Sequence, residues 1–181
     1  MITTVLVITG VLLLTYIVLY NRLIRLKNQV ENSWAQIDVQ LKRRADLLPA
    51  LVQVVKKYAE HEKEVFKHVS DARQKMMTAN TPKENAEANA NIQSALKSLF
   101  AVAEDYPDLK ANKNYKQLQE EISSTENRVA YARQNYNDLV MKYNTTIESI
   151  PSNIVSSLHS IFQQKEFFEA TEEDKAVPNI D

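Results

Sequence analysis

The chain has 181 residues and a formal net charge of −1, because 22 lysines and arginines nearly balance 23 aspartates and glutamates. It contains no cysteine and a single glycine, Gly10, which excludes disulfide scaffolds, thiolate metal sites and a cysteine nucleophile. Glycine-rich phosphate loops, dinucleotide-binding motifs and tight β-hairpins need glycines that this chain lacks. We therefore expect an all-α protein, and the near-neutral charge argues against a nucleic-acid partner.

The N-terminal 21 residues carry no charged side chain. Residues 2–20 would extend about 28 Å as an α-helix, which is close to the hydrocarbon thickness of a bilayer. A cleaved signal peptide is the alternative, but it requires a basic segment before the apolar run and small residues at a cleavage site. This run begins uncharged and ends in Tyr20-Asn21-Arg22. The sequence thus predicts a transmembrane anchor over residues 1–21, with the lipid bilayer as its partner.

Three basic residues, Arg22, Arg25 and Lys27, follow the predicted span directly. Positive charges collect on the cytoplasmic side of membrane proteins. The N-terminus is therefore expected outside and residues 22–181 in the cytoplasm, with Tyr16 and Tyr20 at the level of an interfacial aromatic belt.

Proline alone punctuates the chain beyond the span, and apolar residues between the prolines recur at helical spacing. We expect the span to continue as one helix to Pro49, a second helix to follow that proline, a third to start at Pro82 and a long fourth to follow Pro107. A short amphipathic stretch after Pro151 is expected to cap the end of the bundle. The apolar residues of this stretch are Ile154, Val155, Leu158, Ile161 and Phe162.

Two segments carry specific helix signals. The run Thr81-Pro82-Lys83-Glu84 combines an N-cap threonine, a proline at the first helical position and a capping-box glutamate. From Tyr115 to Ile147 apolar residues alternate in steps of three and four over more than four heptads, which predicts a bundle or coiled-coil seam. We therefore expect an antiparallel bundle of about four helices plus a short C-terminal helix in residues 22–164. Six acidic and two basic residues then predict an acidic tail over residues 165–181.

Charged residues beside the seam are candidates for an interhelix polar network. Glu126 and Arg133 lie one heptad apart, and charges that flank a core stripe tend to pair between helices and fix their register. The expected partners are Arg73 for Glu126 and Asp38 for Arg133.

The densest basic run is Lys42-Arg43-Arg44, and it has two interpretations. It could bind anionic lipid, but on an upright helix it lies about 30 Å beyond Arg22, several Debye lengths from the membrane surface. Local pairing of Lys42 and Arg43 with Asp46, at spacings of four and three residues, is favoured. Lipid binding by the run stays open.

Histidines and carboxylates do not form a recognisable catalytic or metal motif. His61 and His68 share a predicted helix, but seven residues separate the rings by about 10 Å along the axis, too far for one ion. His159 is isolated in sequence. We expect no catalytic residue, no metal site and no cofactor-binding site.

Several runs carry a resemblance to a known family: residues 32–49 (NSWAQIDVQLKRRADLLP), 106–112 (YPDLKAN) and 125–133 (TENRVAYAR). They resemble the signature of the LemA family, and the similarity extends over residues 20–178. The resemblance implies a bacterial single-pass inner-membrane protein with a helical bundle on the cytoplasmic side. It also implies that Asp38, Arg44, Glu126 and Arg133 maintain the bundle or a partner surface. It supplies no reaction, and relatives linked to magnetosome membranes point to membrane organisation.

These features predict a non-enzymatic, membrane-tethered scaffold that forms homo-oligomers and organises membrane or partner proteins. The alternative is an adaptor or accessory subunit of a membrane protease or signalling complex, which predicts a membrane-protein partner in fixed stoichiometry. A third hypothesis, an enzyme, would require Asp38, His61, Glu126 and Arg133 to converge around a cavity.

Overall fold

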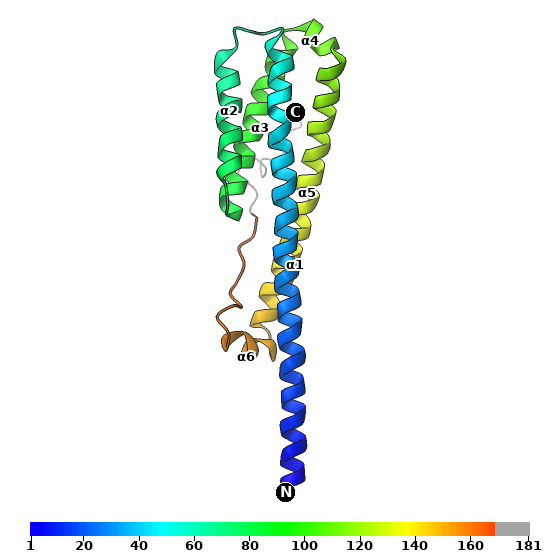
Figure 1. The fold of residues 1–181 in the computed structure, drawn as a ribbon, viewed down its shortest axis with the longest axis vertical. Helices are drawn as coiled ribbons and strands as arrows, with labels where there is room; N and C mark the ends of the chain where they lie inside the picture. Colours follow the sequence, from blue (N-terminus) through cyan, green and yellow to red (C-terminus); the bar gives the residue numbers. More distant parts are fainter. Residues whose placement is uncertain (169–181) are drawn as a thin grey trace, which may run out of the picture. The chain divides into compact units, whose positions relative to one another are not determined.

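The computed structural model describes residues 1–168, and this part of the chain consists of six α-helices without a strand (Figure 1). The helices are α1 (Ile2–Lys56), α2 (Lys63–Thr78), α3 (Pro82–Glu104), α4 (Pro107–Ala111), α5 (Lys113–Glu148) and α6 (Ser152–Ser157). They form two compact units, Met1–Ala35 with Gln134–Phe167 (the first unit) and Gln36–Arg133 with Phe168 (the second unit). The predicted all-α class, with an apolar N-terminal helix that continues into a bundle, is confirmed.

Helix α1 passes through Pro49, where the sequence predicted a helix end. Leu48, Leu51 and Val55 are fully buried on either side of the proline, while Pro49 itself is exposed. Because the apolar stripe continues past the proline, its burial outweighs the cost of a helix-interior proline, which is about 3 kcal/mol. The prediction was therefore wrong about this boundary, and the break falls between Lys56 and Lys63.

In the second unit, α2 and α3 pack against each other as an antiparallel pair (Figure 1). The predicted capping box at the start of α3 is confirmed: the Glu84 amide donates to Thr81 Oγ1 (3.2 Å), and the Thr81 amide donates to the Glu84 carboxylate (3.1 Å). The Asn80 amide also donates to this carboxylate (2.9 Å), and these backbone bonds lower the pKa of Glu84. The start of α3 is thus fixed locally by three residues.

Helix α5 begins with a side-chain cap as well. The Asn112 side-chain oxygen accepts from the amides of Asn114 (2.9 Å) and Tyr115 (3.2 Å), so it satisfies two of the amides that a helix start leaves without partners. None of the described residues has a positive φ angle. The described turns are therefore built from right-handed and extended backbone, with polar side chains closing the helix starts.

The predicted seam lies on α5, with one shift in its position. Its buried residues are Tyr115, Ile122, Thr125, Val129, Ala132, Tyr136, Val140, Tyr143 and Ile147. Leu118 and Leu139 also fall on the predicted spacing of three and four residues from Tyr115, but they are only half-buried, and Val140 is buried in place of Leu139. An α-helix has 3.6 residues per turn, so a strict heptad pattern drifts off the buried face over several turns.

In the first unit, the chain that follows α6 is bonded to α5. The Tyr136 hydroxyl donates to the Glu166 carbonyl (2.8 Å), and the Asn144 side chain makes two bonds of 2.9 Å with the backbone of Lys165. The ring of Trp34 on α1 packs against that of Tyr136, with centroids 5.5 Å apart. Most of the predicted acidic tail, residues 169–181, lies outside the described residues.

The short C-terminal stretch differs from its prediction. Val155 and Phe162 are buried as expected, but Ile154, Leu158 and Ile161 are exposed. The prediction grouped all five apolar residues in one packing stretch, whereas only Val155 and Phe162 pack on the protein, because the helix ends at Ser157 and helical spacing does not continue to Ile161.

Replacing Tyr136 tests the packing of the first unit. Burial raises the pKa of Tyr136 to about 12, and the negative charge of Glu166 adds to the rise. The fold thus favours the neutral phenol, so this stabilisation is complete below pH of about 10, the ordinary tyrosine pKa, and is lost as the pH rises through about 12. Between these two pH values, the free energy of unfolding in detergent should fall less steeply with pH for Tyr136→Phe than for the wild type. Unfolding followed by circular dichroism measures it.

At neutral pH the free energy of unfolding of the same variant should be lower by about 1 kcal/mol, because the hydrogen bond to the Glu166 carbonyl is missing. Tyr131→Phe, at an exposed position of α5, is the matched control and should follow the wild type. If the free energy of unfolding changes equally with pH in the wild type and in Tyr136→Phe, the raised pKa of Tyr136 would be contradicted.

The capping box predicts a second stability effect. Thr81→Ala should lower the free energy of unfolding by about 1 kcal/mol, because the Glu84 amide loses its acceptor. Thr78→Ala is the control, since the Thr78 hydroxyl only donates to carbonyls of its own helix, and its effect should stay within about 0.5 kcal/mol. Urea unfolding measures both, and equal losses would argue against a special role of the cap.

Candidate functional site

The side chain of Arg44 on α1 is only 3% exposed. It lies on the helix face that also buries Leu41, Ala45 and Leu48, so the packing of α1 in the second unit carries the guanidinium into the interior. A guanidinium does not lose its charge in proteins. Burial therefore demands acceptors around it.

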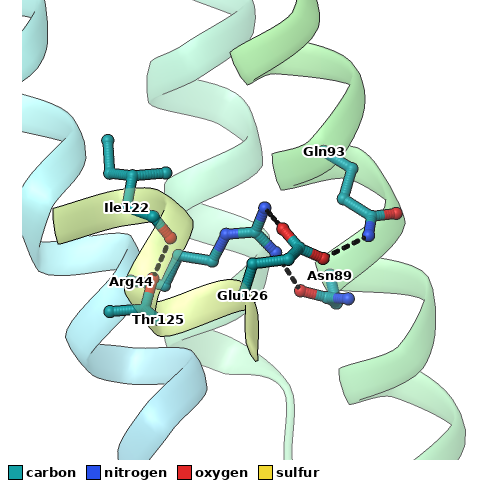
Figure 2. A network of polar contacts seen from close by, with 6 residues as sticks. All are labelled: Arg44, Asn89, Gln93, Ile122, Thr125 and Glu126. Atoms are coloured by element: carbon teal, nitrogen blue, oxygen red, sulfur yellow. Dashed lines mark hydrogen bonds and ion pairs between the residues drawn. The ribbon is translucent and has the colours of Figure 1, made fainter. Parts of the chain in front are cut away.

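Two helices supply these acceptors (Figure 2). Arg44 donates through Nη1 to the Asn89 side-chain oxygen on α3 (3.0 Å), and through Nη2 it pairs with Glu126 on α5. The second carboxylate oxygen of Glu126 accepts from Gln93 on α3 (2.9 Å). Next to Glu126, the buried Thr125 hydroxyl donates to the Ile122 carbonyl (2.7 Å). This Arg44 network joins α1, α3 and α5 within the second unit.

A groove with a volume of about 470 Å³ is lined by the Arg44–Glu126 pair and by apolar and polar side chains of α3 and α5. The apolar part comes from Leu96, Phe100 and Ile122. Arg44, Lys97 and Glu126 are the only acid–base side chains among the described residues that line it. Arg44 and Glu126 neutralise each other, and the other polar side chains of the lining are Lys97, Ser123, Gln93 and Gln119.

The structure brings together two of the five predicted site residues, Arg44 and Glu126, and changes the expected pairings. Glu126 pairs with Arg44 and not with Arg73, and Arg73 instead contacts Asp46 on α1 (3.4 Å). Asp38 pairs with Lys42 on its own helix (2.7 Å). Both of these other pairs are exposed or half-exposed.

The pairing predicted for Lys42 was therefore wrong in its partner, because Asp46 faces α2. The Arg133 guanidinium lies over the ring of Phe168, 4.9 Å from the ring centroid. Of the four residues that the enzyme hypothesis placed around a cavity, Glu126 alone is among the groove-lining side chains of the described chain.

Sequence reasoning missed Asn89 and Gln93. A signal was present, because Asn85 and Asn89 fall on the buried stripe of α3 that continues through Ile92 and Leu96. An asparagine at a core position needs a polar partner. Asn85 donates to the Thr81 carbonyl (3.1 Å), and Asn89 accepts from Arg44.

Residues 33–181, which include the whole Arg44 network, match the sequence profile of the LemA family. The chain belongs to the LemA family. Protein LemA of Metamycoplasma hominis is 28% identical, over 90% of this chain and 74% of the relative. Magnetosome protein MamQ 2 of Paramagnetospirillum magneticum is 24% identical, and Magnetosome protein MamQ of Magnetospirillum gryphiswaldense is 22% identical.

The chain covers just under two thirds, 66%, of each of these two magnetosome relatives, and their matches take in 86% and 85% of this chain. The names of the family and of these relatives denote no enzymatic activity. The resemblance seen in the sequence is thereby confirmed as family membership.

A double-mutant cycle measures the Arg44 network. Glu126→Ala should lower the free energy of unfolding by about 3 kcal/mol, because it leaves a buried guanidinium with one acceptor fewer. The double variant with Arg44→Met should lose less free energy of unfolding than the two single variants together, by about 1 kcal/mol or more. Urea unfolding of the full chain in detergent measures these values.

Asp46→Ala provides the control, because it removes an exposed ion pair and should cost less than about 1 kcal/mol. Strictly additive losses for Arg44→Met and Glu126→Ala would show that the two side chains are not coupled.

Proposed function

We propose that this LemA family chain is a non-enzymatic, single-pass membrane scaffold that self-associates and organises membrane or partner proteins. The observation that carries the proposal is α1 itself. Its N-terminal part is long and apolar enough to cross a bilayer, and none of its most apolar stretch is buried among the described residues. The same uninterrupted helix carries Arg44 and the buried face of the second unit. The scaffold is thus anchored through one of its own core helices.

The orientation is part of the proposal. Arg22, Arg25 and Lys27 directly follow the apolar stretch, which favours the N-terminus outside and the helical units in the cytoplasm of a bacterium, at the inner membrane. The relatives named as magnetosome proteins are consistent with a part in building a cellular structure.

Exposed apolar side chains of the second unit support self-association. Tyr131 on α5 is 76% exposed and Val39 on α1 is 59% exposed. Arg44 contacts Glu126 between these two antiparallel helices. Val39 precedes Arg44 by five residues and Tyr131 follows Glu126 by five, so the two exposed side chains lie at the same level of the helix pair. Apolar residues exposed together favour contact with another molecule.

Light scattering on the full chain in detergent, coupled to size exclusion, tests the scaffold. We expect an oligomer whose mass falls at least about twofold when Val39→Lys and Tyr131→Lys are combined, because lysine is depleted at interface cores. Met77→Lys, at another exposed apolar position on α2, is the control and should keep the wild-type mass. A wild-type chain that stays monomeric at high concentration, with no copy of itself crosslinked in cells, would overturn self-association.

The groove beside Arg44 supports the alternative, an adaptor for a membrane protease or signalling complex. Two chains, one with a photoreactive amino acid at Ser123, which lines the groove, and one with it at Tyr131, distinguish the two functions. A scaffold predicts crosslinks between copies of the chain from position 131. An adaptor predicts crosslinks from position 123 to one different protein in fixed stoichiometry.

A further inference from the structure

Apolar side chains around α6 face away from the protein. Ile154 is 61% exposed and Leu158 is 67% exposed, and Ile150 and Ile161 beside them are also exposed. Ile154 lies in α6 and Leu158 directly follows its last residue, while Ile161 lies in the turn beyond it, and all three side chains are exposed. Single exposed leucines and isoleucines are normal on protein surfaces, but four within one short stretch are not.

The opposite side of the same stretch is firmly held. Val155 and Phe162 are buried, and the Ser156 hydroxyl donates to the Ile147 carbonyl at the end of α5 (2.8 Å). The exposed face is therefore a fixed feature of the first unit, because its backbone is anchored from behind.

An aromatic cluster connects this stretch to the end of the apolar part of α1, and α6 lies beside α1 in Figure 1. Tyr16 Oη and His159 Nε2 are hydrogen-bonded at 2.6 Å. The ring of Tyr20 lies 5.1 Å from that of His159 and 5.6 Å from that of Phe162, between centroids. Tyrosines at the end of a membrane span, followed by a basic residue such as Arg22, mark the depth of the bilayer interface.

The absence of charged residues in this stretch also favours the bilayer interface as its surroundings. Residues 149–164 contain no aspartate, glutamate, lysine or arginine, and no other uncharged run after residue 21 is as long. A segment that enters the headgroup region loses water, and the absence of charge removes the largest cost of that transfer.

We propose that residues 150–162 form a membrane foot: a second contact with the bilayer that α1 spans, in which Ile150, Ile154, Leu158 and Ile161 insert at the boundary of headgroups and acyl chains. The inference rests on the proposed span, because Tyr16 and Tyr20 set the depth of the foot. The occupant of the apolar face is lipid, since the contacts of His159 and Phe162 with Tyr16 and Tyr20 hold this uncharged stretch at the end of the span. The chain thus holds its membrane at two places, through the span and through the foot.

The lack of cysteine makes the test direct, because one introduced cysteine carries one label. Full-length Ile154→Cys and Leu158→Cys, labelled with an environment-sensitive fluorophore, are reconstituted into vesicles of phosphatidylethanolamine and phosphatidylglycerol with or without a quencher on the acyl chains. Met77→Cys is the control, since this side chain is exposed, lies in the second unit and is outside the proposed self-association surface. We expect lipid-borne quenching at positions 154 and 158 about threefold or more above that at position 77.

Quenching at 154 and 158 equal to that at 77, with equal access to iodide in the water, would overturn the foot. Efficient disulfide formation between two Leu158→Cys chains without lipid quenching would assign the face to a second copy, and would overturn it as well. Val11→Cys reports on the span separately. Strong lipid quenching at 11 with none at 154 defeats the foot alone, whereas loss of quenching at both positions defeats the span and the foot together.

Discussion

A guanidinium keeps its charge at any pH at which proteins stay folded, so the buried side chain of Arg44 must meet acceptors wherever α1 places it. Glu126 and Asn89 meet it from two other helices, and Gln93 holds the far oxygen of the carboxylate. A rotation or a sliding of α3 or α5 by one turn within the second unit would leave the charge without these bonds. Buried polar groups fix the register of coiled coils in the same way.

This arrangement also explains what the second unit offers to other molecules. Three ion pairs engage charged side chains of this unit with one another: Arg44 with Glu126, Lys42 with Asp38 and Arg73 with Asp46. Exposed apolar side chains such as Tyr131 are available to a partner beside these pairs. The proposed self-association would use such apolar contacts, because the few well-packed side chains at the centre of an interface carry most of its binding energy.

Local features could be predicted from the sequence, and features that depend on several helices could not. The capping box at Thr81 involves residues close in the chain and was predicted correctly. The break at Pro49 was predicted wrongly, because burial on both sides of the proline outweighs a local preference. The partner of Glu126 depends on how three helices are rotated, which apolar periodicity does not specify. The stretch around Ile154 was expected to pack with all five of its apolar residues, and its pattern did not show that Ile154, Leu158 and Ile161 would stay exposed.

The described connections between helices contain no left-handed residue. This affects how their sequences can change in evolution. Many helices end at a glycine in the left-handed conformation, and such a position tolerates little substitution. Here α3 and α5 are punctuated at their starts, by the side chains of Thr81 and Asn112. A cap of this kind contributes about 1 kcal/mol and can be exchanged among serine, threonine, aspartate and asparagine. Each connection is thus adjustable in small steps by single substitutions, while the helices that it joins keep their sequences.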